Sequence, residues 1–293
     1  DWCYQAMFAR CEKLNYLKVH FTSWADDIEA TSGWVSGVSA TGTFDCPASL
    51  DTITRSTSRI PEGWTINQTS VSNIDYLCFT AEQANSTVDL KGINLPNPDF
   101  QIQIKKGNGN WEDYTLGTKI TLNAIGDKVY FKGNYKAAGE WQFVQFNMSG
   151  KISASGNIMT LTDGDAPTTS LAGKDYCFRY LFGFGCKSSL ITAPELPADT
   201  LAPYCYSKMF NDCKALTNAP TLPAETLADY CYYGMFQGCT ELSSLPNLPA
   251  TIMAVGCYSF MFEGCTGLTT VPTLPTTTLA KRCYWECSKT APN

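Results

Sequence analysis

Alternating apolar and polar positions mark the middle of the chain, residues 74–166, as a set of short strands. Runs such as FQIQIKK and KVYFKGN alternate with a period of two, and turn residues separate them. This period is typical of strands buried on one face. The set favours a β-sandwich or jelly roll over an open sheet, which would leave two long edges. The expected strands lie near Cys78, Val88, Ile102, Leu122, Tyr130, Val144, Ile152 and Leu161.

A second, longer pattern repeats through the C-terminal part of the chain. CYSKMFNDC, CYYGMFQGC and CYSFMFEGC begin at Cys205, Cys231 and Cys257, so the spacing is 26 residues. CFRYLFGFGC, from Cys177, is a looser first copy, and a shortened last copy begins at Cys283. Leucine-rich repeats have periods of roughly 20 to 29 residues, whereas helical pairs and propeller blades need about 33 to 45. The period favours the leucine-rich-repeat class.

Each copy predicts a short strand, a turn and a helix. Prolines in segments such as APTLP keep the strand short, because proline removes a backbone donor. In the copy that begins at Cys231, the residues Leu227, Cys231 and Met235 recur at i, i+4 and i+8, which predicts one apolar helix face, and Gly238 ends the helix. A single unit cannot bury that face, so we expect the copies to stack as a solenoid.

The repeat also carries a family resemblance. Residues 222–246 read LPAETLADYCYYGMFQGCTELSSLP, which matches the pattern LPATTLAxYCYxxMFxGCTSLTxAPxLP nearly throughout. This pattern resembles the BspA-like leucine-rich-repeat surface proteins of gut and oral anaerobic bacteria. CYQAMFARCEKLNYLKV near the start resembles one more copy, and WVSGVSATGTF followed by IPEGW resembles that family's closing cap. The resemblance implies a secreted or outer-surface protein that binds host, neighbouring-cell or matrix components.

The expected fold is multidomain. Residues 1–67 form a leucine-rich-repeat coil and terminal cap, residues 74–166 a β-sandwich-like domain, and residues 170–293 an α/β leucine-rich-repeat solenoid. A cap before the array leaves three arrangements open. The cap closes an upstream array of a longer protein, folds back on its own array, or completes the array of a neighbouring chain.

Composition narrows the range of partners. The net charge is −6, and the 21 Lys and Arg residues are scattered singly, which argues against nucleic acid. No run of about 18 apolar residues occurs, so we expect no membrane span. No signal peptide opens the chain, and any export signal is expected to be removed or to lie upstream.

Candidate catalytic groups are sparse. The only histidine, His20, lies in the alternating run YLKVHFTSW, which indicates a strand position rather than a catalytic base. Asp26 with Asp27, and Glu112 with Asp113, are adjacent, and neighbours on a strand point to opposite faces. The DGD sequence at 163–165 lacks the ligand series of a calcium loop. We expect no catalytic residue, no metal and no cofactor.

The fourteen cysteines allow two interpretations that the sequence leaves open. The paired cysteines of each copy are either disulfides of an exported protein or small buried core residues. Cys283 and Cys287 form the only closely spaced pair, so a zinc site is not expected.

Aromatic positions that recur with the repeat supply the candidate binding surface. A tyrosine follows the first cysteine of successive copies. These tyrosines either pack between neighbouring helices or form a recognition surface, since tyrosine offers a large rigid contact area with a polar tip. We interpret Lys208, Tyr233 and Phe260 as one position at which the copies vary, which suits partner recognition. The expected binding residues are Tyr206, Lys208, Tyr232, Tyr233, Tyr258 and Phe260.

The sequence therefore predicts a non-enzymatic extracellular or cell-surface protein that binds a protein or glycan ligand in adhesion. The alternative is a structural subunit of a surface or phage-borne fibre, which assembles head to tail through residues 1–67 and the open C-terminal array. A glycan-processing enzyme would need paired carboxylates in a cleft, and the sequence offers none.

Overall fold

A computed structural model describes residues 5–19, 24, 31–47, 50–52, 54–69, 74–95, 99–270 and 274–287. The chain forms two compact units, Asp1–Ile74 and Asp75–Asn293. Each unit is described by itself. His20 and the pair Asp26 and Asp27 lie outside the described residues.

The first unit contains a small parallel sheet, in the order β1-β2-β3, with strands β1 (Tyr16–Lys18), β2 (Thr43–Pro47) and β3 (Thr65–Thr69). Leu17 pairs with Phe44 in register, and both side chains are buried. The rings of Trp34 and Phe44 pack edge to face with centroids 6.4 Å apart. These apolar side chains form the core of the unit.

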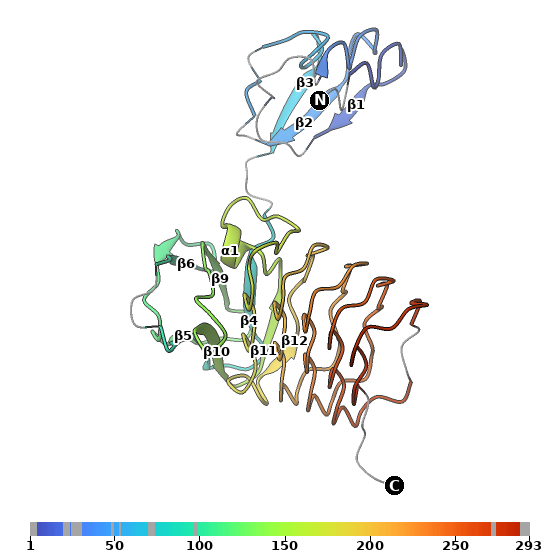
Figure 1. Ribbon diagram of the computed structural model, residues 1–293. Coiled ribbons are helices and arrows are strands. Elements are labelled where there is room, and N and C mark those ends of the chain that lie inside the picture. Colours follow the sequence, from blue (N-terminus) through green and yellow to red (C-terminus); the bar gives the residue numbers. More distant parts are fainter. Residues whose placement is uncertain are drawn as a thin grey trace. The chain divides into compact units, whose positions relative to one another are not determined.

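The second unit begins with two sheets (Figure 1). Their strands are β4 (Leu77–Ala81), β5 (Ser86–Ile93), β6 (Ile102–Lys106), β7 (Glu112–Asp113), β8 (Ile120–Leu122), β9 (Lys128–Gly133), β10 (Phe143–Ser149), β11 (Ile152–Ser155) and β12 (Leu190–Thr192). The smaller sheet has the order β10-β5-β8 and the larger the order β12-β11-β4-β9-β6-β7. Phe79 of the larger sheet packs edge to face on Phe146 of the smaller one, at 4.7 Å between centroids. The apolar sides of the sheets therefore form a common core, and the strands expected near Cys78 to Ile152 are present.

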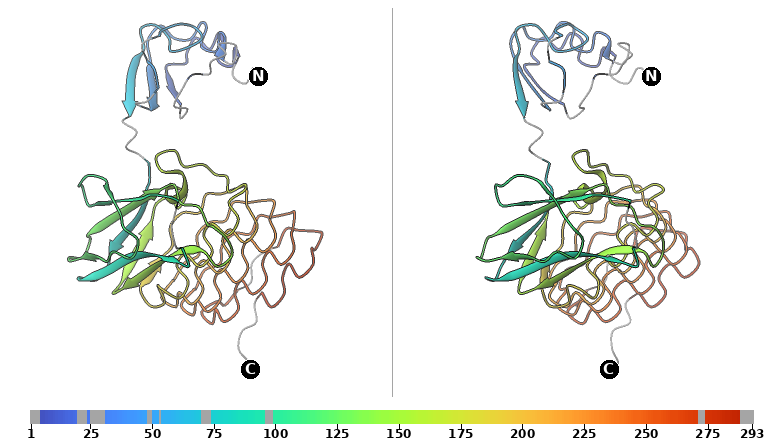
Figure 2. Two further views of the ribbon diagram at one scale, coloured as in Figure 1. Left: turned by 60° about the vertical axis from the view of Figure 1, so that its left-hand side comes forward. Right: turned by 90° about the vertical axis from the view of Figure 1, so that its left-hand side faces the viewer.

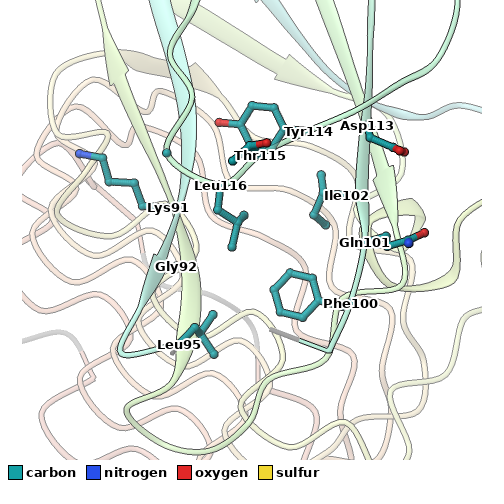
Figure 3. Close-up of a pocket in the computed structure, with 11 residues that line it drawn as sticks. Lys91, Gly92, Leu95, Phe100, Gln101, Ile102, Asp113, Tyr114, Thr115 and Leu116 are labelled. Carbon is teal, nitrogen blue, oxygen red and sulfur yellow. The ribbon is translucent and has the colours of Figure 1, made fainter. Parts of the chain in front are cut away.

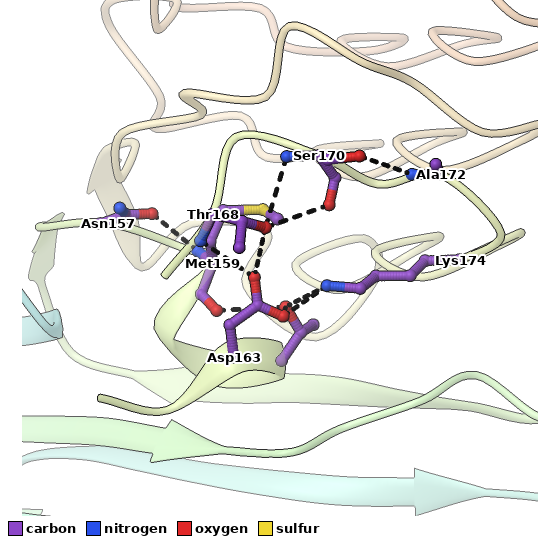
Figure 4. A network of polar contacts seen from close by, with 8 residues as sticks. Asn157, Met159, Asp163, Thr168, Ser170, Ala172 and Lys174 are labelled. Atoms are coloured by element: carbon purple, nitrogen blue, oxygen red, sulfur yellow. Dashed lines mark hydrogen bonds and ion pairs between the residues drawn. The ribbon is translucent and has the colours of Figure 1, made fainter. Parts of the chain in front are cut away.

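The strand expected near Leu161 is wrong, because Thr160–Asp163 form a short helix, α1. Thr160 is buried and its side chain accepts the backbone N–H of Leu77, 3.1 Å away, which holds this turn against the end of β4. Asp163 forms an ion pair with Lys174 and accepts hydrogen bonds from the N–H and hydroxyl of Thr168 (Figure 4). These contacts connect α1 to the first turn of the repeats.

The repeats are built from turns rather than helices. The N–H of Met209 donates to the carbonyl of Tyr206, three residues earlier (3.2 Å), whereas the N–H of Phe210 donates to the carbonyl of Met235 in the next copy (2.9 Å). This alternation continues through residues 230–239 and into the following copy. An α-helix would instead direct every N–H to the carbonyl four residues earlier.

Backbone conformation shows why no helix forms. Tyr204, Lys208 and Asp212 have φ values of 56°, 54° and 60°, so a left-handed residue occurs at every fourth position. A right-handed helix cannot continue through such residues. The spacing of four that suggested a helix face in the sequence is therefore the period of the turns, which lies close to the helical 3.6.

The predicted α/β leucine-rich-repeat solenoid is wrong. Among the described residues, strand positions account for 26% and helix for 2%, and the sheets are flat, so the fold is β-rich. The expected parallel ladder is reduced to β12 and to isolated bridges such as Asn218 with Ser244. Prolines in the connecting segments explain this loss, because they remove ladder donors. We refer to the turn-built residues 174–270 and 274–287 as the repeat stack.

Successive copies of the repeat stack lie side by side (Figures 1 and 2, yellow to red). Two aromatic columns, buried except for the half-buried Tyr284 at the end of one, run through them with centroid separations of 5.3–5.9 Å. One column contains Phe146, Phe182, Phe210, Phe236 and Phe262, and the other contains Phe178, Tyr206, Tyr232, Tyr258 and Tyr284. Because Phe146 belongs to β10, the first column starts in the smaller sheet, and the N–H of Phe146 donates to Leu181 of the first copy (2.7 Å). The smaller sheet thus covers the start of the stack.

Candidate functional site

Three of the residues expected at the binding surface lie in the core instead. Tyr206, Tyr232 and Tyr258 are each 1% exposed and stack in the second buried column. The turns direct the position after the first cysteine inward in each copy, so these rings stabilise the stack and take no part in its surface.

Lys208, Tyr233 and Phe260 are half-buried at the surface, but they do not occupy one equivalent position. The inter-copy hydrogen bonds and positive φ values align Lys208 with Gly234 and Phe260. Tyr233 belongs to the preceding position. Two adjacent positions therefore vary between copies: one holds Arg179, Ser207, Tyr233, Ser259 and Trp285, and the other holds Tyr180, Lys208, Gly234, Phe260 and Glu286. Of these residues, Tyr233, Trp285, Lys208, Phe260 and Glu286 reach the surface, and the others are buried.

Side chains that touch one another form what we call the aromatic band: Tyr176, Arg179, Tyr180, Tyr204, Lys208, Tyr230, Tyr233, Phe260 and Trp285. All of them are half-buried or exposed except Arg179 and Tyr180, which are buried. One row of the band is a tyrosine stack. The rings of Tyr176 and Tyr204 lie 4.9 Å apart and within 15° of parallel, and those of Tyr204 and Tyr230 lie 4.8 Å apart and within 9°. Their spacing follows from the hydrogen bonds between copies, because Tyr204 donates its N–H to the carbonyl of Asp229.

The second row of the band mixes rings with a cation. The Lys208 ammonium lies 5.7 Å from the centre of the Tyr233 ring, within cation–π range. Tyr233 contacts Phe260 at 5.4 Å, and Phe260 contacts Trp285 at 5.9 Å. Tyr230 joins the two rows through an edge contact with Tyr233 at 6.0 Å. The band is therefore continuous over the repeat stack.

A buried arginine fixes one end of the band. The Arg179 side chain is 8% exposed, and its guanidinium carbon lies 4.8 Å from the centre of the Trp141 ring and 5.2 Å from that of Tyr180. Its charge is paired with Glu140, 3.0 Å away. Trp141 is 60% exposed, so it extends the aromatic surface onto the loop before β10.

A glycine ends the tyrosine row at the fourth copy, which begins at Cys257. Gly256 occupies the position equivalent to Tyr230, with φ 59°, and a Cβ there would lie 2.3 Å from Cε1 of the Tyr230 ring. The Tyr230 ring thus lies directly against the backbone of the following copy. Only glycine leaves room for it.

Burial raises the pKa of the Tyr204 and Tyr233 hydroxyls above their ordinary value. Both phenols are therefore neutral at physiological pH, and each offers a hydrogen-bond donor and acceptor at the end of an apolar ring. The band can bind apolar faces and polar groups together.

A hollow of ≈ 570 Å³ lies elsewhere, between β5 and β6. Leu95, Phe100 and Leu116 line it between the two strands, while Lys91 and Asp113 lie on opposite sides of it (Figure 3). The lining contains one carboxylate, of Asp113, and no thiol or imidazole among the described residues. Its chemistry suits an apolar group rather than a reaction.

The other groups considered for chemistry have structural partners. Glu112 pairs with Lys106 (3.0 Å), and Asp113 accepts a hydrogen bond from Gln103 (3.0 Å), so these carboxylates do not act as a pair. Within the described part of the chain, no three His, Cys, Asp or Glu side chains gather as a metal site requires. The cysteines described there are free thiols, and the disulfide interpretation is wrong for them.

No family model matches the chain, and comparison with curated proteins and with solved structures finds no match either. Over the residues that the structure describes, no helix is long and apolar enough to cross a membrane.

Proposed function

We propose that the protein is a non-enzymatic extracellular binding protein, and that the aromatic band is its binding surface. The observation that carries the proposal is the continuity of the band. Half-exposed rings at separations of 4.8–6.0 Å follow one another across successive copies, with the Lys208 ammonium among them.

The rigidity of the band supports this proposal. Each ring is attached to a backbone whose alternate N–H groups bond to the next copy, so the rings are spaced before a ligand arrives. A pre-ordered surface loses less conformational entropy on binding than a mobile one. Tyrosine and tryptophan also provide large contact areas with few rotatable bonds.

Variation at the two adjacent positions supports recognition over packing. The buried columns hold an aromatic residue in copy after copy, whereas Tyr233 and Trp285 reach the surface at a position where other copies hold the buried Ser207 and Ser259. Packing alone would not require this variety at the surface. The chemistry suits a protein or glycan with apolar faces and hydrogen-bond acceptors.

The location outside the cell, or at its surface, rests on the resemblance of the cysteine motifs to BspA-like surface proteins. That resemblance also supports adhesion as the biological role. Neither the proposed location nor the proposed adhesive role is argued from the backbone conformation of the repeats.

A binding screen tests the proposal. The intact chain is presented to immobilised glycans and extracellular-matrix proteins, and its mass is followed by light scattering behind size exclusion. We expect binding to at least one panel member by a species of about 32 kDa. A mass that grows with concentration, with no binding in the panel, would instead favour the fibre-subunit hypothesis.

A further inference from the structure

A second group of charged and aromatic side chains lies on the other face of the larger sheet, away from its packed core. Ser155, Cys78, Tyr130 and Lys105 are partners in register across β11, β4, β9 and β6. Tyr130 and Lys105 are half-buried, whereas their neighbours Phe131 and Ile104 are buried in the core. This face therefore presents polar and aromatic groups to solvent.

Three rings surround the ammonium of Lys105. Its Nζ lies 4.7 Å from the centre of the Tyr130 ring, 5.4 Å from that of Trp111 and 5.9 Å from that of Tyr76. The Tyr76 and Trp111 rings also touch each other edge to face at 4.7 Å. Rings attract a cation but leave its charge uncompensated.

The neighbouring lysine is neutralised, and Lys105 is not. Lys132 pairs with Asp165 at 2.8 Å, and the Tyr76 hydroxyl donates to the same carboxylate at 2.6 Å. Burial tends to raise the pKa of Asp165, but these two hydrogen bonds outweigh it and the pKa falls below its ordinary value. Among the described residues, no carboxylate lies within ion-pair distance of Lys105.

Hydrogen-bonding groups lie next to this cation. A hollow of ≈ 190 Å³ is lined by the amides of Gln101, Gln103 and Asn134, together with Lys132 and Asp165. Amides and a carboxylate around a small hollow can exchange hydrogen bonds with the hydroxyl groups of a ligand. The Trp111 ring, in contact with Lys132 at 4.6 Å, connects the hollow to the cation of Lys105.

We propose that this face of the larger sheet binds an acidic sugar unit. The sugar carboxylate pairs with the Lys105 ammonium, the sugar ring lies against Trp111, and its hydroxyls bond to the amides of the hollow. The site, formed by Tyr76, Lys105, Trp111, Tyr130, Lys132 and Asp165, shares no residue with the aromatic band. It stands or falls independently of the function proposed for the band.

Calorimetric titration of the intact chain with the trimer of galacturonic acid tests this site, with maltotriose as the neutral probe. We expect the acidic trimer to bind, its affinity to fall as salt increases, and maltotriose to bind at least about tenfold more weakly. The variant Lys105→Met keeps an apolar stem among the rings but removes the charge. It should weaken binding of the acidic trimer by about tenfold or more.

Lys106→Met is the matched control, because Lys106 lies on the same strand and is already paired with Glu112. It should bind the trimer within about twofold of the wild type, and both variants should melt as cooperatively as the wild type. Equal affinity for the two trimers, an unchanged affinity in a folded Lys105→Met variant, or no binding of the acidic trimer at about 10 mM would each overturn the proposal.

Discussion

The rings of Phe210 and Phe236 lie within 3° of parallel, with their centroids 5.5 Å apart. The two residues are 26 positions apart in the sequence, and the N–H of Phe210 donates to Met235. The stacking of successive copies thus sets both the spacing of the rings in the buried column and the spacing of the rings in the aromatic band. A ligand that fits the band must match this spacing.

The buried tyrosine column contains hydroxyls that contribute no stability. The Tyr206 and Tyr232 hydroxyl oxygens are buried without a hydrogen-bond partner among the described residues, and Phe178 occupies the equivalent position in the first copy. Tyr232→Phe should therefore raise the free energy of unfolding by about 1 kcal/mol, because it removes an unsatisfied polar group. Urea unfolding measures this change.

Tyr114→Phe is the contrasting variant. The Tyr114 hydroxyl accepts the N–H of Leu90 at 2.9 Å and donates to the carbonyl of Thr118 at 2.6 Å. Its removal should lower the free energy of unfolding by about 1–3 kcal/mol. A loss of stability in Tyr232→Phe as large as in Tyr114→Phe would contradict the assignment of Tyr232 as unsatisfied.

Alanine variants of two glycines distinguish the cost of backbone strain from the cost of a steric clash. Gly256 and Gly264 both have positive φ, 59° and 73°, so alanine at either position costs about 1 kcal/mol or more in strain. At Gly264 the nearest atom to a new Cβ is 3.6 Å away, an ordinary contact. At Gly256 the Tyr230 ring lies only 2.3 Å away, so this ring must also move.

Gly256→Ala should therefore be the more destabilising of the two variants in thermal unfolding, by roughly a further 1–3 kcal/mol. It should also disturb the tyrosine row, which near-ultraviolet circular dichroism detects. Equal losses in the two variants would mean that the Tyr230 ring does not lie against the backbone of the next copy.

Buried thiols predict a loss of stability in alkali. Burial raises the pKa of Cys205 to about 12, from 9.0 for an unhindered thiol. The unfolded chain thus releases this proton first, so the stabilisation is complete below pH 9 and is lost as pH rises toward 12. Each such thiol lowers the free energy of unfolding by about 1.4 kcal/mol per pH unit in that range.

The variant Cys205→Ala measures the contribution of this one group. Its free energy of unfolding should decline less steeply above pH 9 than that of the wild type, by about 1.4 kcal/mol per pH unit. Parallel curves for the two proteins from pH 9 to 11 would show that the Cys205 thiol is accessible to water.

The Asp163 network predicts the opposite pH dependence. Burial tends to raise the pKa of Asp163, but hydrogen bonds from Lys174, Thr168 and Thr162 outweigh it and lower the pKa below 3.8. A lowered pKa stabilises the fold above pH 3.8, and the stabilisation is lost as pH falls further. Asp163→Asn should cost about 1–3 kcal/mol at pH 7 and distinctly less near pH 2. Urea unfolding measures this difference in the free energy of unfolding between the wild type and Asp163→Asn. A difference that stays constant from pH 7 to pH 2 would refute the charge-dependent role of Asp163.

The sequence predicted the strands of the β-rich module well, because alternation reports directly on a face buried against a core. Ile102 and Ile104 are buried, whereas Gln103 and Lys105 are half-exposed, as the period of two requires. The strand prediction failed at Leu161, where a short apolar run lies in α1. A short buried run shows no periodicity that distinguishes a strand from a helix.

The repeat period was visible in the sequence, but the conformation within each copy was not. Residues such as Tyr204 and Lys208 do not suggest positive φ, because non-glycine residues rarely adopt it. The inter-copy hydrogen bonds that hold them there join residues 25 positions apart. A local pattern contains no trace of such bonds.

Part of the aromatic band was predictable and part was missed. Lys208, Tyr233 and Phe260 were identified from their variation, and alignment of the adjacent positions would have added Arg179 and Trp285. The tyrosines after the first cysteine were misplaced at the surface because their recurrence is shared by core and surface positions. Only the burial seen in the structure distinguishes core positions from surface positions.

The most direct test of the central claim measures the affinity of the aromatic band for the panel member that the wild type binds most tightly. The double variant Tyr233→Ser and Phe260→Gly installs residues already present at equivalent positions of other copies, Ser207 and Gly234, so the fold is retained. Tyr232→Phe, in the core, is the control. We predict that the double variant loses at least about tenfold in affinity by surface plasmon resonance while the control matches the wild type. Unchanged affinity in a folded double variant would contradict the assignment of the band as the binding surface.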